Sequence, residues 1–98
     1  MRYDFEWDPQ KARSNVRKHK INFERAATIF RDPNLLSIPD KEHSKSEERW
    51  ITIGIDENGV VLVISHIFRK SSVRVATIRL ISARKATKPE VKQHEEGI

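Results

Sequence analysis

The residues best able to do chemistry in this sequence lie between His66 and Lys85. Asp and Glu are absent from this stretch, and its cations are Arg69, Lys70, Arg74, Arg79, Arg84 and Lys85. Guanidinium groups bind phosphate through parallel hydrogen bonds and stay charged at cellular pH. A histidine can exchange a proton near neutral pH. The pattern therefore predicts a site that binds phosphate groups and, through a histidine, moves protons.

Cleavage of an RNA phosphodiester fits these groups. A 2′-hydroxyl attacks the neighbouring phosphate once a base removes its proton, cations hold the extra negative charge, and an acid protonates the leaving oxygen. We expect Arg69, Arg79 and Arg84 to stabilise that charge and His66 to move protons. This chemistry needs no metal, and no two histidines have zinc-ligand spacing on one predicted element. We therefore expect no metal site.

The net charge of +5 is concentrated in one block. Residues 60–92 hold eight Lys/Arg and one acid, whereas residues 1–59 hold eleven of each sign. A block of one sign often marks a surface that binds polyanions or an acidic protein. The competing interpretation is that the arginines pair with acids elsewhere, for example Glu47, Glu48 or Asp4.

Local signals predict two helices near the start of the chain. Asp8 and Pro9 are a good N-cap and first helical residue, so a helix is expected over 9–19. Asn22 caps a second helix, which ends at Asp32-Pro33. Its buried stripe has helical spacing and consists of Phe23, Ala26, Ala27 and Phe30.

The rest of the chain predicts strands and a final helix. Strands are expected at 4–8, 35–39, 49–55, 60–68 and 75–82, with an Asn-Gly turn at 56–59 and a helix from Ala83 that Pro89 breaks or restarts. Short connections favour antiparallel pairing. We therefore predict an α+β fold, a small antiparallel sheet with two N-terminal helices and a C-terminal helix. Alternation puts His66 on the face of Leu62 and Ile64 and Arg69 on the other face or just past the strand, but the hairpin still brings both close to Arg79.

Length and composition narrow the class of protein. The chain has 98 residues, 37% of them hydrophobic, and no cysteine, which predicts one domain over residues 1–98 without disulfides or thiolate metal sites. The longest apolar run, 60–64, is too short to cross a membrane. We find no export signal and expect a cytoplasmic protein. The sequence also lacks a glycine-rich phosphate loop, a nucleophile elbow and a helix-turn-helix signature.

Several segments together resemble the BrnT-type toxins. The segments are "FEWDPQKARSNVRKHKINFERAATIFRDP", "EERWITIGIDENG" and "IRLISARKATKPE". The resemblance runs from Phe5 to about His94. It implies a RelE-like fold and the toxin of a type II toxin–antitoxin pair. It also implies an endoribonuclease that needs no cofactor and that inhibits translation by cutting RNA. The implied partner is a BrnA-like antitoxin that binds DNA. The toxin would contact operator DNA only through this antitoxin.

The resemblance also suggests which residues act. The matched positions are Lys18, His19, Arg49, Arg69, Arg79 and Arg84. Either His66, or Lys18 with His19, would move protons. The RNA backbone would be bound by Arg49, Lys70, Arg74 and Lys85. Two positions depart from the pattern: Lys20 stands where glycine is frequent, and His94 where tyrosine is.

Two other functions fit the same residues. A non-catalytic module that binds RNA or DNA would use the basic block for phosphate contacts alone. A protein that only docks an acidic antitoxin would use it as an interface. His43, in a polar loop, is expected to be uninvolved.

Overall fold

The computed structural model describes residues 2–45 and 47–97. Five strands and three α-helices follow one another, with 3₁₀ turns at Thr28–Arg31 (η1) and Lys41–His43 (η2). The elements are β1 (Arg2–Glu6), α1 (Pro9–His19), α2 (Phe23–Ala27), β2 (Leu36–Pro39), β3 (Arg49–Ile55), β4 (Val61–Lys70), β5 (Val75–Lys85) and α3 (Lys88–Glu96). Within this part of the chain, no helix is long and apolar enough to cross a membrane.

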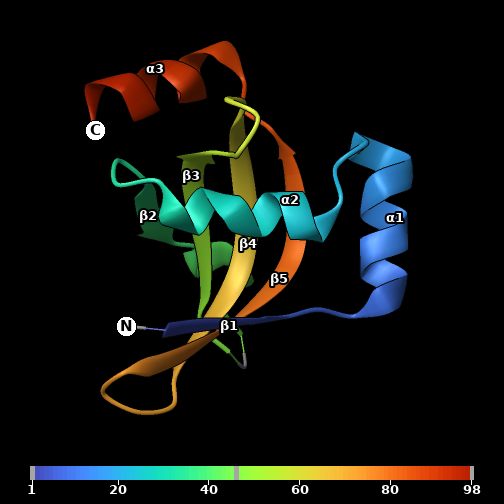
Figure 1. Cartoon of the computed structure of the whole chain (residues 1–98), viewed down its shortest axis with the longest axis vertical. Coiled ribbons are helices and arrows are strands. Elements are labelled where there is room, and N and C mark those ends of the chain that lie inside the picture. The colour runs from blue at the N-terminus through green and yellow to red at the C-terminus, as the bar shows by residue number, and fades with distance from the viewer. Residues whose placement is uncertain (1, 46, 98) are drawn as a thin grey trace.

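The strands form one mixed sheet in the order β1-β5-β4-β3-β2 (Figure 1). β2, β3, β4 and β5 pair antiparallel, but β1 runs parallel to β5 along the outer edge. The predicted α+β class is therefore confirmed, and the prediction of a wholly antiparallel sheet is wrong. The reason is that β1 is not joined to its partner by a short turn. Two helices and three strands separate β1 from β5, so the rule for short connections does not apply.

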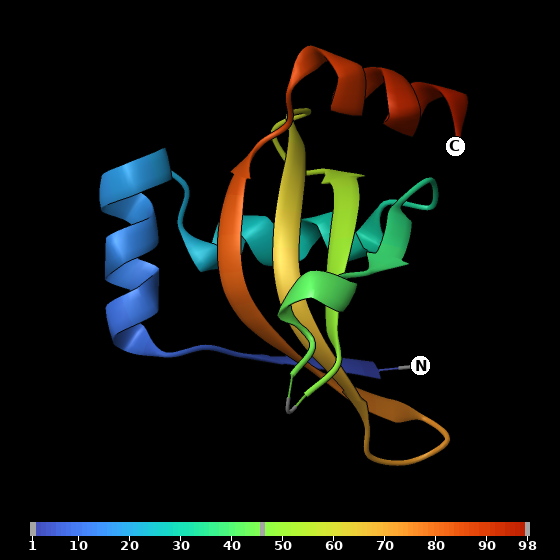
Figure 2. The same ribbon diagram turned by 180° about the vertical axis from the view of Figure 1, so that it is seen from behind.

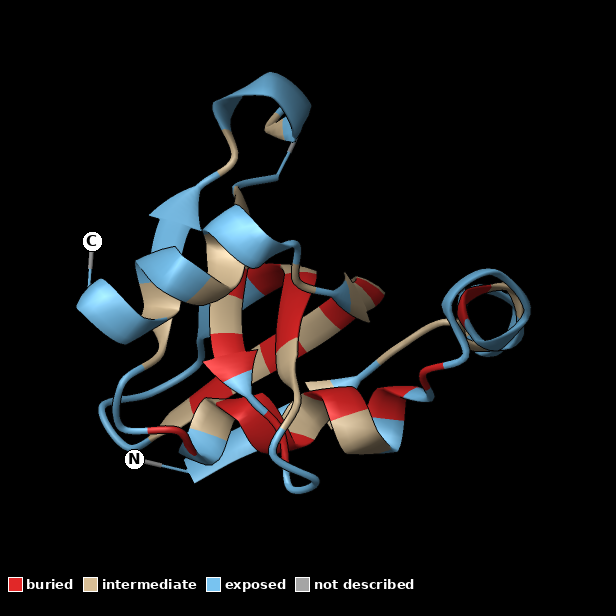
Figure 3. Cartoon of the chain, turned by 90° about the horizontal axis from the view of Figure 1, so that it is seen from above, coloured by how far each residue is buried: buried red, intermediate tan, exposed pale blue. Residues whose placement is uncertain are grey.

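One face of the sheet is covered by α2 and η1. Phe23, Ala26 and Ile29 from this segment pack against the strands and form one buried cluster with Leu62, Ile64, Ile78 and Leu80. Figure 3 shows the buried residues gathered between α2 and the central strands. Gly54 permits the close approach, because a Cβ there would lie 3.0 Å from the Cβ of Ile29.

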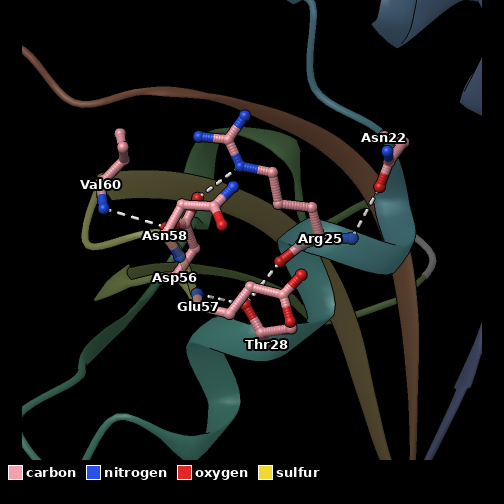
Figure 4. A network of polar contacts seen from close by, with 7 residues as sticks. All are labelled: Asn22, Arg25, Thr28, Asp56, Glu57, Asn58 and Val60. Carbon is pink, nitrogen blue, oxygen red and sulfur yellow. Dashed lines mark hydrogen bonds and ion pairs between the residues drawn. The ribbon is translucent and has the colours of Figure 1, made fainter.

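A buried carboxylate ties α2 to the β3–β4 turn (Figure 4). Asp56 accepts a hydrogen bond from Arg25 Nε at 2.6 Å and from the backbone N–H groups of Asn58 and Val60. Burial raises the pKa of Asp56, but the hydrogen bonds from Val60, Arg25 and Asn58 outweigh it and hold the pKa below its ordinary value. Asp56 is therefore charged at neutral pH and fixes the turn on the helix layer.

The predicted helix starts are confirmed. Asp8 accepts from Gln10 N–H at the start of α1, and Asn22 accepts from Arg25 N–H at the start of α2. α1 ends on Lys20, which has φ 62° and is the one non-glycine residue with positive φ in the described ranges. Glycine suits this left-handed position best, which explains why lysine is a departure there.

The C-terminal elements differ from the prediction. β5 continues to Lys85, with Ala83 paired to Ile64, where a helix was expected from Ala83. The helix begins only at Lys88, after a capping box between Thr87 and Glu90. Pairing with β4 extends the strand because backbone hydrogen bonds override the local helical preference. As a result, Arg84 is a strand residue.

Candidate functional site

The two faces of the sheet differ in how far other elements cover them. Leu62 and Ile64 pack towards α2, so the alternate residues of β4 point away from it. The corresponding residues of the other strands follow from the strand register. We call this surface the open face, and its residues are Arg49, Ile51, Ile53, Val63, Ser65, Ile67, Arg69, Thr77, Arg79, Ser82 and Arg84. Figure 2 looks onto it, with the β2–β3 loop lying in front of the strands.

Four of the predicted arginines belong to the open face. Arg49 pairs with Ile67, and Ile67 pairs with Arg79, so the three form one row across β3, β4 and β5. Arg69 pairs with Thr77, which makes Arg69 a diagonal neighbour of Arg79. Such neighbours lie about 7–8 Å apart.

Arg84 lies farther along the same face. It pairs with Val63 whereas Arg79 pairs with Ile67. The two partners are roughly 13 Å apart along β4, at about 3.3 Å per residue. Arg69, Arg79 and Arg84 therefore share a face but not one point. A phosphodiester chain, rather than a single phosphate, matches this spread.

A groove of about 290 Å³ connects Arg49 with Arg84 on the open face. Its remaining lining is Asp40, His43, Ile51, Val63, Ser65, Ile81 and Ser82. His43 was expected to be uninvolved, yet η2 carries it into this groove. Its Nδ1 lies 2.9 Å from Asp40 Oδ2. A carboxylate on one ring nitrogen orients the imidazole and leaves Nε2 to exchange a proton.

The arginines are not free of acids. Arg69 lies 3.6 Å from Glu47, and Arg79 lies 3.7 Å from Glu6. The competing interpretation, that the arginines pair with acids, is therefore correct for Arg69 and Arg79, and Glu47 is one of the acids that it named. Both contacts are longer than a hydrogen bond and exposed. Exposed pairs of this kind contribute little free energy, so a phosphate can displace the acid.

Arg84 is held much more firmly. Its two terminal nitrogens donate to the two oxygens of Glu90 at 2.8 and 2.9 Å. The hydrogen bonds from Arg84 lower the pKa of Glu90 to about 2, and the same pair raises the pKa of Arg84. The acid comes from the first turn of α3. A phosphate must compete with Glu90 for this guanidinium group.

His66 does not join the arginines. It lies on the face covered by α2, is 3% exposed, and meets the ring of Phe30 edge-on. Its Nε2 lies 2.7 Å from Thr52 Oγ1. Burial lowers the pKa of His66 to about 4, so the ring is neutral at pH 7. The expected neighbourhood of His66, Arg69 and Arg79 is wrong, because the sheet itself separates the imidazole from the guanidinium groups.

Lys18 and His19 lie at the exposed end of α1. The helix is anchored by buried Asn15, which donates to the carbonyls of Ile21 and Ala83 and accepts from Ala83 N–H. Asn15 thereby fixes α1 beside the residue that precedes Arg84. Helical periodicity puts Lys18 on one side of Asn15 and His19 on the side nearer α2. Lys18 therefore lies on the side of α1 away from α2.

The other predicted RNA-binding cations lie elsewhere. Lys70 pairs with Ala76 and Lys85 with Leu62, and both of these partners point towards the helix-covered face. Arg74 is exposed in the β4–β5 turn, beyond the covered part of the sheet. These three cations do not border the groove. In residues 2–45 and 47–97, no group of three or more His, Cys, Asp or Glu side chains is placed to hold a metal ion.

Comparison with known proteins identifies the family. A family model described as "Ribonuclease toxin, BrnT, of type II toxin-antitoxin system" matches residues 7–90. The chain belongs to the BrnT family. BrnT proteins are ribonuclease toxins of type II toxin–antitoxin systems, a class that implies an RNA substrate and an antitoxin partner. No curated protein matches the sequence.

A solved structure supports the same fold. The 1.1 Å crystal structure of the Brucella abortus ribonuclease toxin BrnT superposes with a TM-score of 0.64. The match covers 90% of this chain and all of the Brucella chain, at 19% sequence identity. At that identity the similarity concerns the fold, and the predicted BrnT resemblance is confirmed by the family model.

Proposed function

We propose that this chain is an endoribonuclease that cuts RNA in the groove between Arg49 and Arg84, without a metal, and thereby inhibits translation. The observation that carries the proposal is the His43–Asp40 pair in the same groove as two guanidinium groups. These are the base, its orienting carboxylate and the phosphate ligands that RNA transesterification needs.

The reaction proceeds by attack of the RNA on its own phosphate. His43 Nε2 takes the proton of the 2′-hydroxyl, and the 2′ oxygen bonds to phosphorus. The bond from phosphorus to the 5′ oxygen breaks, which leaves a 2′,3′-cyclic phosphate and a free 5′-hydroxyl. Of the predicted pair Lys18 and His19, Lys18 is our candidate for protonating the leaving oxygen, because it lies on the side of α1 away from α2.

The arginines act at successive phosphates. Arg49 and Arg84 border the groove and hold the negative charge of the scissile phosphate. Arg79 and Arg69 continue the row along the open face and bind the neighbouring phosphates. This assignment keeps the predicted arginines and moves the proton-transfer role from His66 to His43.

The test is cleavage of an end-labelled RNA by the purified chain in the presence of EDTA. We expect products with 2′,3′-cyclic phosphate ends, and a loss of at least 100-fold in rate for His43→Ala, within the range of about 10² to 10⁴ that general acid–base catalysis contributes. Arg49→Ala should lose a similar amount. Arg74→Ala is the control, because Arg74 lies outside the groove. Normal cleavage by both groove variants, or no cleavage by the wild type in EDTA, would reject the proposal.

One observation favours a second candidate function, RNA binding without cleavage. Glu90 already occupies both donor groups of Arg84. If no substrate displaces it, the open face binds RNA through its other cations alone. A gel-shift assay that shows bound but intact RNA would identify this case.

The wider biology is part of the same proposal. The antitoxin is BrnA-like and carries the DNA-binding part, and the complex reaches operator DNA through the antitoxin. We further propose that the fold is RelE-like, that residues 1–98 form one domain, and that the protein acts in the cytoplasm.

A further inference from the structure

Most residues of α1 are exposed. Of its eleven residues, all of them described, only Asn15 is buried. Figure 3 shows α1 end-on, standing apart from the two packed layers. A helix of this length is marginal by itself in water, so its form depends on its anchor on β5. Most of its surface is available to a partner.

A groove of about 410 Å³ runs between α1 and the start of α2. Apolar side chains in it are Ala12, Val16 and Phe23. Phe23 is fully buried and belongs to the core, whereas Val16 is 42% exposed. Single exposed apolar residues are ordinary, but Val16 lines a concave surface that continues into the core. The groove therefore offers an apolar floor that consists of Ala12 and Val16.

Cations predominate around this floor, where Glu24 is the one acid among the described lining residues. Residues 9–22 contain Lys11, Arg13, Arg17, Lys18 and Lys20 and no acid. Within the described part of the chain, none of the five forms an ion pair, in contrast to Arg69, Arg79 and Arg84. Arg13 and Arg17 are themselves part of the groove lining. The charge on α1 is thus left for another molecule to neutralise.

We propose that an acidic amphipathic helix of the antitoxin binds in this α1–α2 groove. The proposal rests on the pairing with an antitoxin proposed above. Apolar residues one turn apart on the partner pack on Ala12 and Val16, and its Asp or Glu residues meet Arg13 and Arg17. RNA is the other polyanion that α1 could attract. The apolar floor favours the peptide, because a phosphate backbone gains nothing from Val16.

The position of the groove has a functional consequence. Ala12 and Val16 lie on the side of Asn15 opposite to Lys18, so a helix bound here does not itself cover the open face. Binding of the antitoxin and cleavage of RNA can therefore be separated by mutation. A variant with a damaged α1–α2 groove should remain a ribonuclease that its antitoxin no longer controls.

The experiment co-expresses the full chain with the product of the adjacent reading frame and measures their dissociation constant after purification. We expect Val16→Glu to weaken the complex at least tenfold. Val73→Glu is the matched control, because Val73 is 81% exposed in the β4–β5 turn and should leave affinity unchanged. The charge reversal Arg13→Glu/Arg17→Glu should weaken the complex strongly, and Lys70→Glu/Arg74→Glu should not.

RNA cleavage by the same variants completes the design. Val16→Glu should keep the circular dichroism spectrum and cleavage rate of the wild type. The inference is overturned if Val16→Glu weakens the complex no more than Val73→Glu, or if the wild type forms no complex. It is also overturned if the α1 variants bind antitoxin normally but lose cleavage, since α1 would then bind RNA. A wild type that binds antitoxin but cuts no RNA would instead refute the proposed function.

Discussion

Glu90→Gln removes the charge that holds Arg84 while changing little else. Both oxygens of Glu90 accept from Arg84, and one also accepts from Thr87 N–H in the capping box. Glutamine at this position still accepts from Thr87, so the start of α3 is preserved. What is lost is the charge-assisted, two-bond pair between α3 and β5. Since none of the described residues of α3 is buried, its attachment should depend largely on this pair and on His94, whose Nε2 lies 2.7 Å from Asp32 Oδ2.

The size of the loss follows from the pKa of Glu90, which is lowered from 4.5 to about 2. At about 1.36 kcal/mol per pH unit, this shift sets an upper value of about 3.4 kcal/mol. The side chain of Arg84 is 42% exposed, so water screens part of the attraction. Because exposed pairs contribute only about 0–1 kcal/mol, we expect the free energy of unfolding to fall by about 1–2 kcal/mol at pH 7.

The same pair predicts a pH dependence. The carboxyl of Glu90 has a pKa of about 2 in the folded chain and an ordinary value of 4.5 when unfolded. As the pH falls below 4.5, the unfolded chain takes up the proton first, which favours unfolding. The stabilisation is therefore complete above pH 4.5 and is lost as the pH approaches 2.

Urea unfolding followed by circular dichroism at pH 7, 4 and 3 measures both effects. The difference between wild type and Glu90→Gln should shrink from pH 4 to pH 3. Glu96→Gln is the matched control on the same helix, because Glu96 lies 3.8 Å from exposed Lys92. It should cost less than about 0.5 kcal/mol. Equal losses for the two variants, or a difference that stays constant down to pH 3, would refute this account of how α3 is held.

Three further changes test other parts of the structure. Lys20→Gly should raise the free energy of unfolding by about 1 kcal/mol, because Lys20 holds φ 62°; a lower urea midpoint would contradict this. Asn15→Ala should cost about 3 kcal/mol by leaving backbone groups of Ala83 and Ile21 unpaired, against less than about 0.5 kcal/mol for Ser14→Ala. The imidazole of His66 should stay neutral in NMR spectra from pH 8 to pH 5, since burial lowers its pKa to about 4; a midpoint near 6.5 would refute its burial. Because the pKa of His66 is lowered on folding, its effect on stability is favourable above pH 6.5 and lost as the pH falls to 4.

The sequence by itself determined the elements whose signals are local. Asp8 and Asn22 start their helices where the caps predict them, and β3 spans residues 49–55 as its alternation indicates. A helix cap or an alternating strand depends on residues a few positions away in the sequence. These signals are therefore independent of how the rest of the chain folds. The family motifs, too, are short sequence segments in a fixed order, and they were sufficient to predict the BrnT family.

Tertiary structure decided which face of the sheet is buried and which is exposed. Alternation placed His66 with Leu62 and Ile64, but only the packing of α2 made that face the buried one. The same packing left Arg49 and Arg79 on the open face. Periodicity distinguishes two sides of a strand and cannot say which of them a distant helix will cover.

Tertiary structure also decided which charges meet. His43 became a candidate base because η2 folds over the open face beside Arg49 and Arg84, although its own segment reads as a polar loop. Pairing with β4 extends β5 to Lys85, and the capping box starts α3 at Lys88. These two boundaries bring Arg84, at the end of β5, next to Glu90 in the first turn of α3. Charges attract at any sequence separation, so their partners are chosen by the burial of apolar surface that brings the elements together.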